Sequence, residues 1–193
     1  MIGFLKTYGL DQSMKLNLEP NHGTLAGHNY EHDVVMASQY GFLGSIDANT
    51  GDPSLGWDTD QFPMQLKDCA ALVNVIVAQG GIAPGGLNFD AKVRRESTDD
   101  ADLLIAHVGA MDCFALALRR VVAMRAAGTI ERMVAARYAS FDSGVGRAIE
   151  TGQASFKQLE QHILQMSADQ QEPKPVSGQQ EKYEQIVNNF LYK

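Results

Sequence analysis

The stretch GFLGSIDANTGDPSLGWDTDQFPMQLKDCAALVNVIVAQGG, residues 41–81, decides the fold class. Residues 41–47 form a short apolar run that ends in an acid, a pattern typical of a strand buried in a parallel sheet. A polar loop rich in Gly and Pro follows, and residues 62–81 then have the apolar spacing of an amphipathic helix. A strand followed by a helix is the repeating unit of α/β proteins.

Two similar units flank this stretch. Residues 14–19 are expected to form a strand that precedes a helix at 28–41, and residues 85–90 a strand that precedes a long helix at 100–128. Residues 2–10 read as the end of a further helix. Because strands alternate with helices, we expect a parallel sheet and an α/β fold.

The strand pattern stops after residue 128, and a helical part follows. It contains a polar linker at 167–180 and three short amphipathic segments, 129–141, 155–166 and 181–193. We therefore predict a division into residues 1–128 and a helical tail, residues 129–193. A tail with little sheet to pack on favours contact with a neighbouring subunit, that is, oligomerisation.

Composition excludes several classes of protein. The chain of 193 residues has a net charge of −7 and no run of Lys or Arg, which argues against nucleic acid and anionic membranes as partners. We see no signal-peptide pattern and no apolar run of about 20 residues, and so expect a soluble, cytoplasmic protein. Cys69 and Cys113 lack a CxxC pairing, and we expect buried, reduced thiols.

All three predicted strands end in an acid, namely Glu19, Asp47 and Asp90. The carboxyl ends of parallel strands lie at one edge of the sheet, where α/β proteins place their ligand sites. A single acid at a strand end would be unremarkable. Three in succession predict a site at this edge.

Two further motifs add ligands to the same edge. His22 follows Glu19 in an E-x-x-H motif, and Asp58 and Asp60 form a D-x-D motif in the loop after the second strand. Taken alone, each motif is more typical of capping or turn chemistry. Together with the strand-end acids they supply five carboxylates and one imidazole, a set that suits Mg²⁺, Mn²⁺ or Co²⁺. Five acids exceed the charge of one divalent ion, so we expect two ions that share a carboxylate.

Other candidate residues have alternative interpretations. His28 and His32 are four residues apart, but the segment lacks the H-E-x-x-H pattern, which favours a structural role for both. Trp57 is a candidate for lining the substrate pocket and equally for packing its own loop. Lys92 lies two residues beyond Asp90 and is a second candidate for binding substrate. It belongs equally well to a solvated basic loop.

The segments that carry these residues resemble xylose isomerases of the longer-chain class found in many bacteria. The resemblance covers essentially the whole chain, and its clearest motifs are KLNLEPNHGTLAGH (15–28), GSIDANTGDPSLGWDTDQFP (44–63) and GGLNFDAKVRR (85–95). It implies a (β/α)₈ barrel, usually in a homo-oligomer. It also implies a metal-dependent aldose–ketose isomerase that interconverts D-xylose and D-xylulose and acts on D-glucose.

The resemblance also implies a role for each residue of the site. Glu19 would bridge two divalent ions, and Asp47 and Asp90 would bind the ion that holds the hydroxyls of the sugar. His22, Asp58 and Asp60 would bind the second ion, which assists a 1,2-hydride shift. Asp58 and Asp60 are thus the candidate catalytic residues, with Asp60 orienting the water that handles the hydroxyl proton.

This sequence matches only the C-terminal half of the family's chain, which is about twice as long. Met1 falls within the helix that precedes the sixth strand, so that five of the eight strands of a barrel lie outside the match. Three strands would leave two open edges and an unfilled, apolar barrel face. We expect the chain to self-associate or to pair with a complementary N-terminal half. The alternative is a catalytically incomplete metal-binding half-barrel that serves as an interaction module.

Overall fold

The computed structural model describes residues 1–172, 174 and 176–193. Contacts between residues divide the chain into two units, residues 1–123 and 124–193. This division falls within a long helix, five residues before the boundary at 128 that the sequence suggested.

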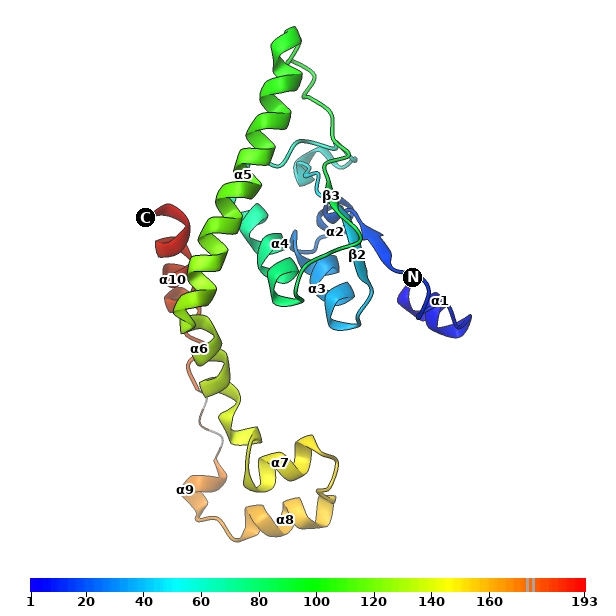
Figure 1. The fold of residues 1–193 in the computed structure, drawn as a ribbon. Helices are drawn as coiled ribbons and strands as arrows, with labels where there is room; N and C mark the ends of the chain where they lie inside the picture. The colour runs from blue at the N-terminus through cyan, green and yellow to red at the C-terminus, as the bar shows by residue number, and fades with distance from the viewer. Residues whose placement is uncertain (173, 175) are drawn as a thin grey trace. The chain divides into compact units, whose positions relative to one another are not determined.

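The first unit is built on a parallel sheet of three strands (Figure 1). The strands follow one another in the sheet in chain order: β1 (Leu16–Leu18), β2 (Leu43–Asp47) and β3 (Leu87–Asn88). Each parallel pair is joined by a crossover that contains a helix, as the alternation of strand and helix predicted. The α/β class is therefore confirmed.

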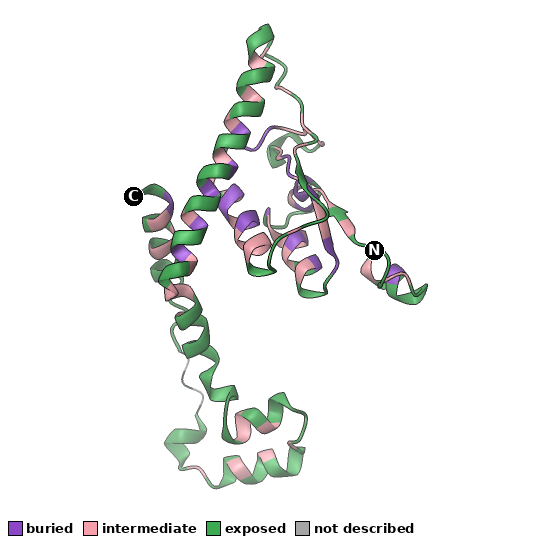
Figure 2. Ribbon diagram, viewed as in Figure 1, coloured by how far each residue is buried: buried purple, intermediate pink, exposed green. Residues whose placement is uncertain are grey.

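Six helical segments belong to this unit in whole or in part. They are α1 (Ile2–Thr7), α2 (Pro20–Leu25), α3 (His32–Gln39), the 3₁₀ turn η1 (Pro53–Leu55), α4 (Leu66–Ala78) and the first part of α5 (Asp100–Ala127). The core lies among the sheet, α3, α4 and one side of α5, where buried positions gather in Figure 2. Its fully buried side chains include those of Val34, Ile46, Leu72 and Val121.

The segment after β1 differs from the sequence-based prediction. A short helix, α2, begins directly after the strand with Pro20 in its first turn, a position where proline is well tolerated. The next helix, α3, begins only at His32 rather than at residue 28. His28 and His32 are therefore not on one helix, although their rings stack with centroids 4.0 Å apart.

The sheet carries a row of polar side chains, and this corrects the expectation of an apolar barrel face. Ser45 Oγ donates a hydrogen bond to Asn17 Oδ1 at 2.6 Å. The Asp47 carboxylate accepts hydrogen bonds from Asn17 Nδ2 at 2.5 Å and from Asn88 Nδ2 at 3.1 Å. Each strand thus contributes at least one polar residue to a hydrogen-bond network that crosses the sheet.

The exposed apolar surface lies instead on α5. By length and composition this helix could cross a membrane, contrary to the expectation that no apolar segment is so long. The core helix of a soluble protein passes the same test, but only 17% of the most apolar window of α5 is buried. A helix that is apolar on all sides normally packs against partners on more than one face.

The regular elements of the second unit, among its described residues, are all helices. Its elements are the last residues of α5, then α6 (Thr129–Tyr138), the 3₁₀ turn η2 (Ala139–Phe141), α7 (Gly144–Glu150), α8 (Phe156–Leu164), α9 (Ala168–Gln171) and α10 (Gln180–Tyr192). A capping box formed by Ser155 and Gln158 starts α8. The short helix α9 lies inside the predicted polar linker, and residues 173 and 175 of that linker lie outside the described residues.

Candidate metal centre

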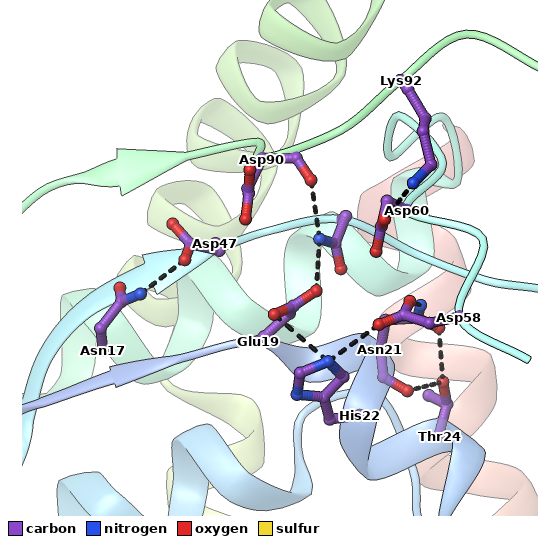
Figure 3. A network of polar contacts seen from close by, with 11 residues as sticks. Asn17, Glu19, Asn21, His22, Thr24, Asp47, Asp58, Asp60, Asp90 and Lys92 are labelled. Atoms are coloured by element: carbon purple, nitrogen blue, oxygen red, sulfur yellow. Dashed lines mark hydrogen bonds and ion pairs between the residues drawn. The ribbon is translucent and has the colours of Figure 1, made fainter.

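Three predicted ligands come together where β1 ends (Figure 3). Glu19 is the first residue after β1, and His22 follows three positions later in the short helix α2. As a result, His22 Nε2 lies 3.3 Å from Glu19 Oε2. Asp58 reaches the same point from the loop after η1, and its Oδ2 lies 2.9 Å from His22 Nε2. One ligand atom from each residue lies within 4.8 Å of the others. This group is called the Glu19–His22–Asp58 cluster below.

The charges of this cluster are only partly compensated. Burial raises the pKa of the Glu19 carboxyl, and the negative charges of Asp58 and Asp60 act in the same direction. A hydrogen bond from Asn49 and the proximity of His22 lower the same pKa. Carboxylates held this close to one another are stabilised by a cation, which would favour their ionised forms.

Asp60 lies beside the cluster and is paired with Lys92. Lys92 Nζ lies 2.6 Å from Asp60 Oδ2, and this hydrogen bond is the main reason why the pKa of Asp60 is lowered and that of Lys92 is raised. Asp60 has a backbone φ of +43°, a left-handed conformation that is uncommon for residues other than glycine, although aspartate tolerates it better than most. Such strain is concentrated at functional sites in proteins.

The remaining predicted ligands, Asp47 and Asp90, lie on the same edge of the sheet but outside the cluster. The Asp47 carboxylate is held by Asn17 and Asn88, as described above. Asp90 accepts a hydrogen bond from Asn49 through its backbone oxygen, at 2.9 Å, and also has a φ of +43°. The edge therefore gathers all six predicted residues, three of them within reach of one cation.

The donors of this edge fit a divalent cation that prefers oxygen. The cluster offers two carboxylates and one imidazole, and further carboxylates lie beside it. Oxygen donors with a single nitrogen suit Mg²⁺, Mn²⁺ or Co²⁺. The cluster contains no thiol, so it fits an oxygen-preferring cation better than a zinc ion bound by thiolates.

Trp57 and Lys92 line one surface cavity with Asp58. This cavity, of about 540 Å³, lies between the loop after η1 and residues 92–96. The Trp57 ring is half exposed, and the Arg95 guanidinium lies over it at 5.8 Å from the ring centroid. Both candidate substrate-binding residues thus border the cluster through Asp58.

Sequence reasoning missed two residues that contact the cluster, Asn21 and Asn49. Each lies two positions beyond a strand-end acid, in the segments Glu19-Pro20-Asn21 and Asp47-Ala48-Asn49, and Lys92 lies two positions beyond Asp90. This repeated acid-x-polar spacing at three strand ends was the signal available in the sequence.

The pairing of Lys92 with Asp60 predicts a measurable pH effect. The variant Lys92→Met is expected to raise the pKa of Asp60, because it removes the hydrogen bond that contributes most to the lowering. A carboxyl whose pKa is lowered by folding contributes stability above its unfolded pKa of about 4 and loses it as the pH falls through the folded value. The destabilisation caused by Lys92→Met is therefore expected at neutral pH and should fade in acid.

An NMR titration of the Asp60 side-chain carboxyl, with urea unfolding at pH 7 and pH 3, measures both effects. Lys157→Met, at an exposed position of α8, is the matched control. An unchanged Asp60 titration in Lys92→Met would contradict the assignment.

The first unit is an α/β protein with a parallel sheet, and its candidate metal-binding residues lie at the carboxyl ends of the strands. This is the usual place for a ligand site in such folds. Known proteins with similar sequences agree with this class and narrow it to relatives of the xylose isomerases. The xylose isomerase of Xanthomonas oryzae pv. oryzae (strain MAFF 311018) is 51% identical over 191 residues, which cover 99% of this chain. Xylose isomerase 1 of Xanthomonas campestris pv. campestris (strain 8004) is 52% identical over 191 residues. Residues 134–191 also match a family model described as the XylA2 C-terminal domain.

The chain is therefore a relative of the xylose isomerases and matches their C-terminal part, as its motifs predicted. It spans 42% of the length of the curated relatives that it matches.

Proposed function

We propose that this chain provides the metal-binding part of a metal-dependent aldose–ketose isomerase that interconverts D-xylose and D-xylulose. The observation that carries the proposal is the Glu19–His22–Asp58 cluster at the end of β1, in a chain about half identical to xylose isomerases. D-Glucose and D-fructose are a second substrate pair of the same chemistry. Sugar metabolism of this kind would place the protein in the cytoplasm.

The proposed reaction moves one hydrogen between neighbouring carbons of the open-chain sugar. The hydrogen on C2 moves with its electron pair to C1, and a proton moves from the oxygen on C2 to the oxygen on C1, so that an aldose becomes a ketose. Two divalent cations, when bound, would stabilise the negative charge that develops on the sugar oxygens.

The residues of the edge have separate proposed roles. Glu19 is proposed to bridge the two cations, with His22, Asp58 and Asp60 on one of them and Asp47 and Asp90 on the other. Asp60, held by Lys92, would orient the water that carries the hydroxyl proton, and Asp58 would assist it as the second catalytic carboxylate. Trp57 would offer the sugar an apolar ring face beside this pair.

The sugar requires a more enclosed pocket than three strands form. Within the described residues, β1 and β3 each pair with another strand on one side, which leaves two sheet edges for further pairing. We propose that the site becomes competent when the remaining βα units are supplied by a complementary polypeptide or when copies of the chain assemble. Nucleic acid is not a proposed partner, because the net charge is −7.

The decisive experiment is xylulose formation from D-xylose with Mn²⁺. The chain is assayed alone and mixed with the N-terminal part of the X. campestris relative that it does not match. We expect conversion in the mixture, and we expect its loss when the chain carries Asp58→Ala and Asp60→Ala together. Conversion that persists with the double variant would reject the proposed site.

A second candidate function is a metal-binding half-barrel without catalysis, which acts as an interaction module. The exposed apolar side of α5 and the two free sheet edges favour it. Mn²⁺ binding without conversion, both with and without the complementary polypeptide, is the result that would select this alternative.

A further inference from the structure

Two asparagines, Asn21 and Asn49, are the buried polar residues of the described chain, each with 0% of its surface exposed. Burial of an amide is unfavourable unless its hydrogen-bonding groups find partners. Neither residue is a predicted ligand, and neither has a role in the function proposed above. Their contacts show what the chain gains from burying them.

Asn49 connects the ends of β1 and β3. Its Nδ2 donates hydrogen bonds to Glu19 Oε1 at 2.8 Å and to the backbone oxygen of Asp90 at 2.9 Å. Its Oδ1 is buried and has no hydrogen-bond partner within the described residues. Both hydrogen bonds from Asn49 Nδ2 are therefore made to residues of the site, while its Oδ1 could still accept a hydrogen bond there.

Asn21 holds the loop that carries Asp58. Its Nδ2 donates a hydrogen bond to Asp58 Oδ1, and its own Oδ1 accepts one from Thr24 Oγ1 at 3.2 Å. The loop passes so close that a Cβ added to Gly51 would lie 2.1 Å from Asn21 Oδ1. The backbone of the loop thus packs directly against this amide.

The two amides bind the carboxylates of the cluster in the same way: each holds one of the two oxygens and leaves the other facing His22. Asn49 binds Oε1 of Glu19, and Oε2 of the same carboxylate faces His22 Nε2 at 3.3 Å. Asn21 binds Oδ1 of Asp58, and Oδ2 faces the same nitrogen at 2.9 Å. Each asparagine thereby fixes which oxygen of its carboxylate points to the common centre.

We infer that Asn21 and Asn49 are positioning residues, which orient Asp58 and Glu19 so that one oxygen of each converges with His22 Nε2 on a divalent cation. The inference rests on the proposed function and adds to it the residues that preorganise the site. Outer hydrogen bonds of this kind tune metal affinity by about ten- to a hundredfold in other proteins. A purely structural role would need only a side chain of the same volume.

The test replaces each amide by leucine, which is similar in size and lacks polar atoms. Mn²⁺ affinity is measured by electron paramagnetic resonance, and the visible spectrum of the Co²⁺-loaded chain reports the geometry of the ligands. Asn21→Leu and Asn49→Leu are each expected to weaken Mn²⁺ binding about ten- to a hundredfold and to change the Co²⁺ spectrum. Asn29→Leu, at an exposed position of the same unit, should leave both measurements unchanged.

Asn49→Ser serves as the conservative variant, because its smaller side chain leaves room for a water that can donate to Glu19. We expect it to recover part of the affinity lost in Asn49→Leu, and it replaces that variant in the test if leucine prevents folding. Folded leucine variants with wild-type affinity and an unchanged Co²⁺ spectrum would overturn the inference. A wild-type chain that does not bind Mn²⁺ would instead overturn the metal site itself, and the positioning role with it.

Discussion

The variant Asp58→Asn should bind Mn²⁺ at least about a hundredfold more weakly than the wild-type chain, a loss of about 2.7 kcal/mol of binding free energy. Asp58 Oδ2 faces His22 Nε2 at 2.9 Å, and Asp58 adds one of the two carboxylates of the Glu19–His22–Asp58 cluster. Asparagine keeps the shape of the side chain but removes its charge, and divalent cations of this class depend on anionic oxygen ligands. Isothermal titration with Mn²⁺ measures the change directly.

A second measurement uses the stability of the folded chain. A ligand that binds only the folded state raises the free energy of unfolding by RT ln(1 + [L]/Kd). At one Mn²⁺ concentration, the melting temperature of the wild type should therefore rise by more than that of Asp58→Asn.

Asp52→Asn is the matched control for this prediction. Asp52 lies on the same loop, but its carboxylate accepts hydrogen bonds from Ser54 rather than facing His22. We expect Asp52→Asn to keep wild-type Mn²⁺ affinity. Equal binding by Asp58→Asn and the wild type would show that the cluster is not the metal site.

The second large effect is expected on the assembly of the chain. Several exposed apolar residues of α5 recur at spacings of three, four and seven residues, which fit the heptad pattern typical of helices packed side by side. These residues are Leu104, Val108, Met111, Leu118 and Val122, and each is between 47% and 69% exposed. We expect the isolated chain to elute with a mass above that of its 21.0 kDa monomer.

The double variant Val108→Lys/Leu118→Lys should shift the chain to a monomer, because it places two charges in the middle of this apolar row. Leu116→Lys is the control, since Leu116 is also exposed on α5 but lies outside the row. Light scattering after gel filtration gives the masses. A wild-type chain that is monomeric at high concentration would contradict the prediction.

Local sequence patterns were sufficient for most of the secondary structure. Each predicted strand contains an observed one, because an apolar run between turn residues favours a buried strand wherever it lies. Patterns failed for α2 and for the start of α3. A short helix begins at Pro20 immediately after the strand, and the sequence has no apolar periodicity there that would predict it.

The surface of the sheet differs from the apolar barrel face that the sequence predicts. Hydrogen bonds across the sheet join Asn17, Ser45 and Asn88 in a polar network with Asp47. The apolar surface that the sequence required was found on α5 instead. Which side of an element stays uncovered depends on its neighbours, and these are not a local property.

The sequence alone determined that this is an α/β protein with acids at the carboxyl ends of its strands, because alternation along the chain and parallel pairing place those acids at one edge. Only the tertiary structure decided that Glu19, His22 and Asp58 converge, that Lys92 holds Asp60, and that Asn21 and Asn49 orient the carboxylates. Contacts between residues 30 to 40 positions apart depend on the path of loops, since a shift of one residue in a loop moves a carboxylate by more than the length of a hydrogen bond.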